Sequence, residues 1–250
     1  MPSFETPTKP LAAGTPSSLP QPAPESLGQR LAKRVVHFFT YRFALQRSQA
    51  AEAFASGFRF VVPPTVFHPS LFKTGPYFAE FIAGLNLEGR AVADIGTGSG
   101  ILALAAARAG AKSVLAVDIN PHAAKAACDN AEINGLRDRI SAVCSNLLTA
   151  LDARRMFDVI VSNPPYFAGE PRDLADRAWH SGPAHRDIVA LFEQSRERLK
   201  PGGRMYVLFS TRADLEFLRT LMETAGFRSR PVSERSILID TFVIYELEAG

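Results

Sequence analysis

A run of closely spaced glycines follows a short apolar segment near the middle of the chain. The run reads Asp94-Ile95-Gly96-Thr97-Gly98-Ser99-Gly100, and a helix-forming segment comes directly after it. Glycines let the backbone turn sharply and approach a ligand closely, and the amino end of the helix points at that ligand. Asp118 ends the next apolar segment, where a carboxylate can accept hydrogen bonds from both ribose hydroxyls. This pattern predicts a site for an adenosine-containing cofactor.

The glycine run leaves more than one interpretation open. Gly98, Gly100 and Ala103 also fit the looser G-x-G-x-x-A pattern of dinucleotide sites, and turning glycines without a ligand are a second alternative. Asp94 favours S-adenosylmethionine over NAD, because dinucleotide folds usually need an apolar residue at that place. A carboxylate there suits a ligand that carries its own ammonium group. The dense G-x-G-x-G spacing directly after the acid points the same way.

A second motif follows a later apolar segment. Phe157–Ser162 leads directly into Asn163-Pro164-Pro165-Tyr166. Proline has no N–H, so Pro164 presents only a carbonyl acceptor, and the Asn163 side chain adds a second oxygen. Two convergent acceptors fit a planar NH₂ donor, on which the Tyr166 ring can stack. We therefore predict that this motif is catalytic and acts on an amide or amino nitrogen.

Both motifs require a scaffold that brings the ends of several strands together. From Arg90 onward, strand-like and helix-like segments alternate, which predicts an α/β fold with a parallel sheet and helices on both faces. In such folds the carboxyl ends of the strands form the ligand crevice. The predicted strands are Ala91–Ile95, Ser113–Ile119, Ile140–Ser145, Phe157–Ser162, Arg204–Phe209 and Ser236–Leu247. The predicted helices lie near Gly100–Ala109, Pro121–Asn134, Arg186–Leu199 and Arg212–Ala225.

The front of the chain differs in composition. Residues 1–24 contain seven of the 18 prolines and are predicted to form a disordered tail. Residues 25–56 are predicted to be a helical extension, with a helix from about Glu25 to Ala55. Residues 57–250 then form the catalytic domain, which begins with a short strand in which Phe58, Phe60 and Val62 alternate with other residues.

Charge and composition exclude several classes of protein. The 250 residues carry a formal net charge of +3, and residues 1–55 account for all of it. A neutral remainder argues against a dedicated nucleic-acid protein, whose footprint is usually a basic face. Cys128 and Cys144 have no metal-type spacing, and we expect no disulfide framework, secretory leader or membrane span. We therefore expect a cytoplasmic protein without a metal site.

The two motifs together resemble class I S-adenosylmethionine-dependent methyltransferases. The resemblance is to the HemK-like family, the glutamine methyltransferases of polypeptide release factors and their relatives, and runs from about Phe58 to Glu248. It implies a Rossmann-like sheet of seven strands in the order 3-2-1-4-5-7-6, mostly parallel, with the last strand antiparallel. It also implies S-adenosylmethionine as cofactor. The implied cofactor-binding residues are Asp94, Gly96, Thr97, Gly98, Ser99, Gly100, Asp118, Ile119, Asn146, Leu147 and Asn163.

The resemblance does not identify the methyl acceptor. Asn146 stands where the family usually has an acid near the adenine, and Thr65–Thr74 replaces a family segment of the Pro-x-Asp-Thr-Glu type. A protein glutamine or a small amide or amine is the favoured acceptor, and an amino group of adenine or guanine in nucleic acid is the alternative. An NAD-dependent oxidoreductase and a non-catalytic cofactor-binding protein are the alternatives from other classes. The oligomeric state stays open.

A few residues after the second motif carry weaker signals. His180 and His185 are interpreted as substrate-loop or surface residues rather than a metal pair. Trp179 fits either a lid or the core, and His68 fits a structural or pocket-lining role.

Overall fold

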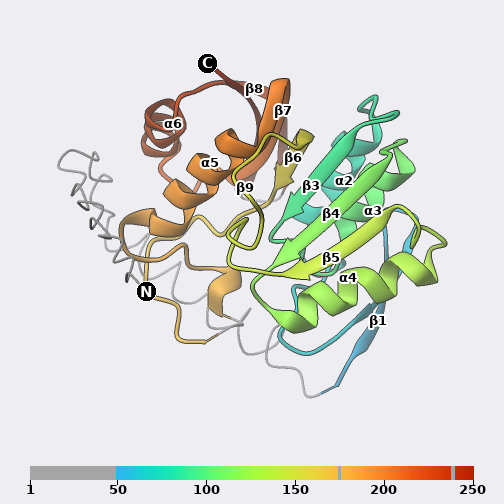
Figure 1. Cartoon of the computed structure of the whole chain (residues 1–250). Coiled ribbons are helices and arrows are strands. Elements are labelled where there is room, and N and C mark those ends of the chain that lie inside the picture. Colours follow the sequence, from blue (N-terminus) through green and yellow to red (C-terminus); the bar gives the residue numbers. More distant parts are fainter. Residues whose placement is uncertain (1–48, 174–175, 238–239) are drawn as a thin grey trace, which may run out of the picture.

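The computed structural model describes residues 49–173, 176–237 and 240–250 (Figure 1). The predicted tail and most of the predicted helical extension therefore lie outside the described residues. A seven-stranded sheet forms the centre of the described chain, with helices on both of its faces (Figure 1). Its strands are β3 (Ala91–Ile95), β4 (Ser113–Asp118), β5 (Ile140–Cys144), β6 (Phe157–Ser162), β7 (Leu199–Ser210), β8 (Phe227–Ile237) and β9 (Asp240–Ala249). The α-helices are α2 (Thr74–Ala83), α3 (Ile101–Arg108), α4 (Pro121–Ile133), α5 (Arg186–Arg198) and α6 (Leu215–Thr224).

The order of the strands confirms the expected topology. The sheet reads β5-β4-β3-β6-β7-β9-β8, which is the order 3-2-1-4-5-7-6 when its strands are numbered along the chain. Strands β3 to β7 pair in parallel, and β9 runs antiparallel to both β7 and β8. The order reverses beside β3, so the crevice of a doubly wound sheet opens there.

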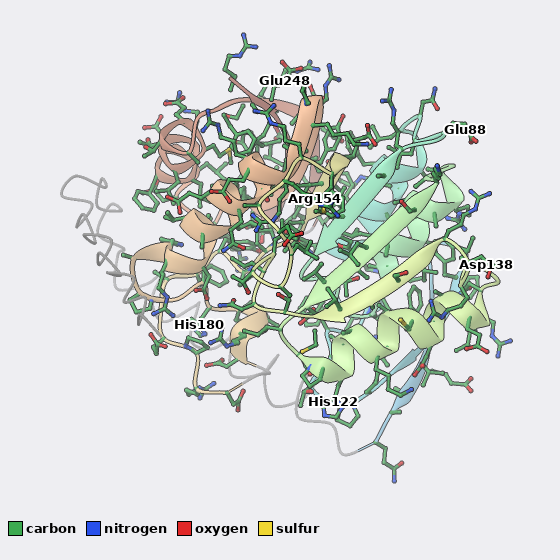
Figure 2. The ribbon with its side chains drawn as sticks, viewed as in Figure 1. Glu88, His122, Asp138, Arg154, His180 and Glu248 are labelled. Carbon is green, nitrogen blue, oxygen red and sulfur yellow. The ribbon has the colours of Figure 1, made fainter. Side chains whose placement is uncertain are left out.

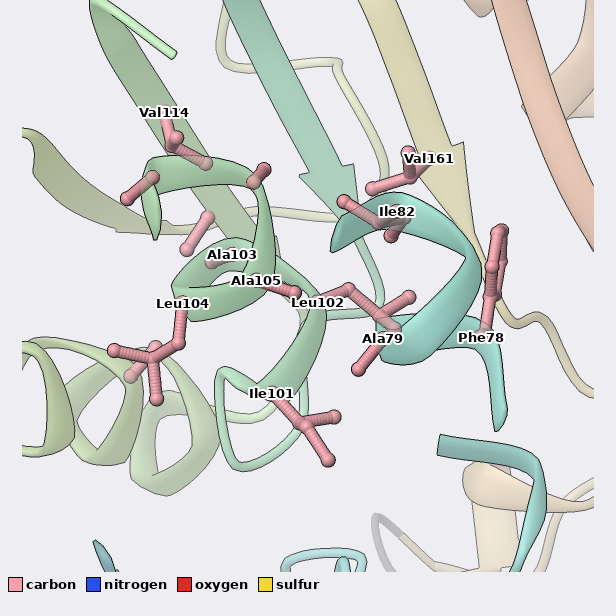
Figure 3. Close-up of a cluster of buried hydrophobic side chains, with 14 of the residues drawn as sticks. Phe78, Ala79, Ile82, Ile101, Leu102, Ala103, Leu104, Ala105, Val114 and Val161 are labelled. Carbon is pink, nitrogen blue, oxygen red and sulfur yellow. The ribbon is translucent and has the colours of Figure 1, made fainter. Parts of the chain in front are cut away.

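Helix α3 forms the centre of one core layer. Seven of its eight residues are buried, so it is apolar on every side and must be enclosed. In Figure 3, Leu102 of α3 lies against Ala79 of α2, below Val161 of the sheet. Leu104 is fully buried in the same cluster, and replacing such a leucine by alanine typically costs about 2–5 kcal/mol. This packing fixes α3, and with it the glycine run at its amino end.

The end of the predicted helical extension is wrong. Residues Ala51–Ala55 form a strand, β1, which pairs antiparallel with β2 (Phe58–Val62). Ser56 and Gly57, both with positive φ, close the hairpin. The helical interpretation extended an upstream apolar stripe too far, although Ala53 and Ala55 alternate toward the core as a half-buried strand requires.

The predicted strands miss most of β8, and they differ from β7 and β9 in their bounds. Strand β8 is an edge strand in which only Phe227 is fully buried, so it lacks the apolar alternation that marks an inner strand. Strand β7 begins at Leu199 rather than Arg204, ahead of Pro201 and two glycines. Strand β9 begins at Asp240 rather than Ser236, because residues up to Ile237 belong to β8.

Helix α4 holds the front hairpin against the domain. The Asn134 side chain accepts from the backbone N–H of Arg59 at 3.0 Å and donates to its carbonyl at 2.7 Å. Asn130 does the same for Val61, at 2.8 and 3.3 Å. The free edge of β2 is thus paired with two side chains one helical turn apart. Within the described residues, no helix is long and apolar enough to cross a bilayer.

Candidate active site

The predicted site residues share one edge of the sheet. In Figure 2, Glu88 and Asp138, which precede β3 and β5, mark one edge, and His122 and His180 mark the opposite edge. Strands β3, β4, β5 and β6 are parallel, so all four end at the His122 edge. The glycine run, Asp118, Asn146 and Asn163 lie at or directly after these four ends. The topology therefore brings both motifs to one place, as the sequence predicts.

Asp94 lies in β3, beneath the glycine run, and is fully buried. Its Oδ2 accepts from the hydroxyl of Thr97 at 2.7 Å and from the backbone N–H of Ala103 at 3.0 Å. Its Oδ1 is buried and has no hydrogen-bond partner in the described structure. Burial raises the pKa of Asp94 to about 7, against the lowering effect of both hydrogen bonds.

The glycine run leaves open space at Gly96. A Cβ placed on Gly96, which has φ +75°, would meet nothing within 4 Å. Gly100 has φ +87°, and a Cβ there would approach Ala127 Cα to 3.0 Å, so this glycine is needed for the close contact of α3 with α4. Gly100, the N-cap residue of α3, provides no side-chain cap, and among the first N–H groups of the helix that of Ala103 is taken by Asp94. Open space in the glycine run, together with the unpartnered Asp94 Oδ1, fits a ligand with a polar, ammonium-bearing end.

Asp118 ends β4 and ties two loops together. Its Oδ2 accepts from the backbone N–H of Gly98 at 2.9 Å, and its Oδ1 accepts from the backbone N–H of Asn120 at 2.9 Å. Burial raises the pKa of Asp118 above its usual range, although backbone hydrogen bonds oppose this shift. Each carboxylate oxygen can accept a second hydrogen bond. The residue can therefore shape the glycine run and still accept from ribose hydroxyls, and its neighbour Ile119 is half-buried.

Two further predicted residues follow β5. The Asn146 side chain is exposed, and its backbone carbonyl accepts from the hydroxyl of Thr149 at 2.8 Å. Leu147 is half-buried with φ +51°, an uncommon conformation for a leucine. Contact of Asn146 and Leu147 with an adenine ring stays a prediction.

Asn163 stands at the end of β6 and reaches toward the start of α2. Its Nδ2 donates to the hydroxyl of Thr74 at 3.4 Å, so its Oδ1 is the atom left to accept from a substrate. Pro164 is buried, and Pro165 is half-buried. The hydroxyl of Ser162 donates to the carbonyl of Ile95 at 2.8 Å, which fixes the motif beside β3 and its glycine run.

Tyr166 packs among protein side chains. Its ring lies edge-on to Phe167 at 4.8 Å and to Phe209 at 6.2 Å. Burial raises the pKa of Tyr166 to about 12, with Asp240 adding to the shift. In this arrangement the Tyr166 ring supports the motif through its contacts with these protein side chains. Stacking of Tyr166 on a substrate stays a prediction.

Half-exposed aromatic rings from two distant segments meet beside the motif. Phe67 and Phe72 precede α2 and stack at 3.8 Å between ring centroids. Trp179 stacks on Phe167 at 5.9 Å with the ring planes only 4° apart, and it meets Phe72 edge-on at 6.2 Å. A Cβ on Gly98 would lie 3.8 Å from Phe67 Cβ. We call Phe67, Phe72, Phe167 and Trp179 the aromatic row, which extends from the glycine run to the Asn163 motif.

The histidines after the motif hold its loop in shape. His180 Nδ1 lies 3.4 Å from Asp176 Oδ1, and the Asp176 side chain is 1% exposed. His185 is buried, and its Nδ1 lies 3.0 Å from the hydroxyl of Ser181. His68 is buried and accepts from the Ser70 N–H at 3.3 Å. In the part of the chain that the structure describes, no group of three metal-binding side chains occurs.

The sequence pattern alone does not single out three residues of this site. Thr74 orients Asn163, and Phe67 covers the glycine run. Asn120 donates to the carbonyl and hydroxyl of Thr65, both at 3.2 Å, and so fastens the segment before α2 to the end of β4. Each acts through a contact between distant parts of the chain. The one local signal is the Asn120-Pro121 start of α4, where Asn120 is the N-cap.

The chain is similar in sequence to known methyltransferases. Residues 76–168 match the family model of ribosomal protein L11 methyltransferases. A Methanocaldococcus jannaschii protein, provisionally named as a protein N5-glutamine methyltransferase, is 30% identical over 167 residues, covering 64% of this chain and 83% of that protein. A ribosomal protein L11 methyltransferase of Enterobacter sp. is 39% identical over 113 residues, covering 45% of this chain and only 37% of that protein.

Solved structures agree with these relatives. A ribosomal protein L11 methylase from Lactobacillus delbrueckii subsp. bulgaricus is 26% identical with a TM-score of 0.52, covering 72% of this chain and 80% of that one. A T. thermophilus 16S rRNA N2 methyltransferase in complex with AdoMet and guanosine is 25% identical with a TM-score of 0.59, covering 81% of this chain and 50% of that one. The strand order, the glycine run above Asp94 and the match to 83% of the M. jannaschii relative lead to one conclusion. The chain belongs to the class I S-adenosylmethionine-dependent methyltransferases.

Proposed function

We propose that the protein transfers a methyl group to the planar amide or amino nitrogen of an acceptor, with a protein glutamine as the favoured acceptor. The observation that carries this proposal is the position of Asn163, held by Thr74 at the end of β6 beside the glycine run. The M. jannaschii relative, provisionally named for glutamine N5 methylation, supports the choice of glutamine. S-adenosylmethionine, when bound, supplies a methyl group activated by its sulfonium.

Asn163 and Pro164 perform the central step in this proposal. The lone pair of an amide nitrogen is delocalised into the adjacent carbonyl, so the nitrogen is a weak nucleophile. Asn163 Oδ1 and the Pro164 carbonyl accept from the two N–H groups, which directs the lone pair toward the methyl group. The same acceptors stabilise positive charge as it develops on the nitrogen. No strong base is required, because the methylated cation is itself acidic and loses a proton readily.

The cofactor side follows from the unmet hydrogen-bonding capacity of the loop. Asp94 and the residues from Gly96 to Gly100 would hold the methionine part, since Asp94 Oδ1 lacks a donor and the space above Gly96 is open. Asp118 would accept from the ribose, and Asn146 with Leu147 would border the adenine. Holding donor and acceptor in line can contribute about 7–11 kcal/mol to lowering the barrier.

A nucleobase amino group is the second candidate acceptor. The aromatic row offers flat surfaces that suit a flipped-out base. The T. thermophilus relative, whose structure holds guanosine, supports this alternative. The two candidates share the grip on an NH₂ group and differ only in what surrounds it.

The deciding experiment is methyl transfer from tritiated S-adenosylmethionine into a cell extract, separated into protein, nucleic-acid and small-molecule fractions. We expect label in protein, and after complete enzymatic proteolysis in N5-methylglutamine. Label confined to RNA or DNA would replace glutamine by a nucleobase. Label on oxygen or sulfur would contradict the nitrogen acceptor itself.

A further inference from the structure

A groove runs along the outer side of α2, outside the site described above. It has a volume of about 360 Å³. Its walls come from α2, from β8 and from the end of α3 near the hairpin turn. The lining residues include Lys73, Pro76, Tyr77, Glu80, Arg108 and Arg235.

One end of this groove opens at the edge of the sheet that carries Asn163. Lys73 directly precedes Thr74, whose hydroxyl contacts Asn163. On the opposite wall, Arg235 pairs with Phe242, which pairs in turn with Ser210 of β7. Ser162 pairs with Val207 of the same strand, so Arg235 lies beyond the end of β6, at the level of the catalytic motif. The groove therefore begins beside the proposed acceptor site and leads away from it.

The groove carries more positive than negative charge. Three cationic side chains, Lys73, Arg108 and Arg235, face one acid, Glu80. Arg235 lies over the Tyr77 ring at 4.5 Å and pairs with Glu80 at 2.8 Å. Arg108 lies over the Phe58 ring at 3.8 Å and donates to the Ser56 carbonyl at 2.7 Å. Both guanidinium groups are thus held in place. Among the described residues, their remaining N–H groups have no other hydrogen-bond partner, and exposed Lys73 has no ion-pair partner.

The lining and length of the groove favour a polypeptide ligand over a nucleic acid. Single-stranded nucleic acid needs exposed aromatic rings on which bases stack, but the Tyr77 ring is only 3% exposed and is covered by Arg235. The apolar part of the groove includes small or flat surfaces such as those of Ala83 and Pro76. The ten residues of α2 span about 15 Å. That is the length of four or five extended residues.

We propose that this groove binds an acidic segment of the polypeptide that carries the methyl-accepting glutamine. This inference rests on the proposed function, which identifies the bound polypeptide as the methyl acceptor. The groove begins beside the residues that would hold the glutamine of that polypeptide. Carboxylates of the segment would meet Arg108, Arg235 and Lys73, which would set the direction in which the glutamine enters.

The test uses the full chain and fluorescein-labelled peptides of about a dozen residues. One peptide has a single glutamine flanked on one side by glutamates, and its matched partner has lysines in place of the glutamates. A single-stranded uridine oligonucleotide of similar length is the nucleic-acid probe. Fluorescence anisotropy measures binding, which needs no methyl transfer.

We expect the acidic peptide to bind and the lysine peptide to bind at least fivefold more weakly, because its lysines would be repelled by the cationic side chains. The expected difference is no larger because each exposed ion pair contributes little binding free energy. Lys73→Glu and Arg235→Gln should each weaken the acidic peptide several-fold, and salt should weaken it further. Lys112→Glu, a change at an exposed site outside the groove, is the matched control and should change nothing. Melting temperature and S-adenosylmethionine affinity show that each variant is folded.

Equal binding of the two peptides, or unchanged binding in Lys73→Glu and Arg235→Gln, would overturn the proposal. Tighter binding of the oligonucleotide, lost in the same two variants, would replace it with a nucleic-acid surface. Tritium transfer to the acidic peptide is measured in parallel. Binding without transfer would leave the groove intact and count against the proposed glutamine acceptor, so the two failures are distinguishable.

Discussion

The contact between Thr74 and Asn163 provides the sharpest test of the proposed mechanism. Thr74→Val keeps the shape of the side chain and removes the hydroxyl that accepts from Asn163 Nδ2 at 3.4 Å. A neutral hydrogen bond is worth about 0.5–1.5 kcal/mol. If Thr74 orients the amide, methyl transfer should therefore fall by about two- to twelvefold, while S-adenosylmethionine affinity stays within about threefold. Thr74→Ser keeps a hydroxyl and should retain most of the activity.

Asn163→Ala should cost far more, about 10²–10³ in transfer, with cofactor affinity again within about threefold. Because Thr74 is proposed to act only through Asn163, adding Thr74→Val to Asn163→Ala should cause no further loss. The assay is single-turnover transfer to the acceptor identified in the extract, with cofactor affinity measured by calorimetry. Equal losses from Thr74→Val in both backgrounds would show that Thr74 acts independently. A loss of transfer in Asn163→Ala that came only from lost cofactor affinity would refute the amino-group grip.

Three further predictions concern the cofactor side. Asp118→Ala should weaken S-adenosylmethionine binding at least tenfold in calorimetry, because charged hydrogen bonds are worth about 1.5–3 kcal/mol each; unchanged affinity in a folded variant would remove Asp118 from the site. Since burial raises the pKa of Asp94 from 3.8 to about 7, the free protein should lose stability as pH rises through that range, on the order of 4 kcal/mol before relaxation. In Asp94→Asn, the free energy of unfolding measured with urea should not show this dependence on pH. The same pH profile in Asp94→Asn as in the unmodified protein would contradict the prediction. Gly100→Ala should lower the melting temperature by several degrees, because its Cβ would lie 3.0 Å from Ala127 Cα. Gly135→Ala, with φ +68° and nothing within 4 Å, is the matched control and should show backbone strain alone, so an equal effect would exclude the contact as the cause.

The sequence predicts the sheet well because its inner strands carry strong local signals. Strands β3 and β6 are predicted with their observed bounds, and the end of β4 differs by one residue. Each inner strand is a short apolar run followed by turn or loop residues, a pattern that packing on both faces requires. The edge strand β8 lacks this signal because nearly all of its side chains are exposed or only half-buried. Strand β1 was obscured because its alternation is short and alanine also favours helices.

Asp94 shows what a sequence can and cannot say about a single residue. Its type and position predict a role at the cofactor site. Its geometry adds that one oxygen is occupied in bracing the loop through Thr97 and Ala103, while the other is buried without a donor. Only the fold reveals this division. A buried acceptor without a partner costs free energy, and a bound ammonium group would recover that cost. The free protein should therefore gain stability on binding S-adenosylmethionine.

The acceptor side is least visible in the sequence because it is assembled from distant segments. Thr74 meets Asn163 across 89 positions, and Phe72 meets Trp179 over a still longer separation.

The match to the L11 methyltransferase family spans residues 76–168. It begins just after Thr74 and ends before Trp179, so it contains the cofactor loop and the Asn163 motif and leaves out most of the aromatic row. Relatives named for a ribosomal protein, a glutamine and a ribosomal RNA all resemble this chain. Altering the segments that flank the matched span would change the surroundings of the acceptor and keep the cofactor loop. We therefore expect segments 65–74 and 166–173, rather than the glycine run, to determine the acceptor.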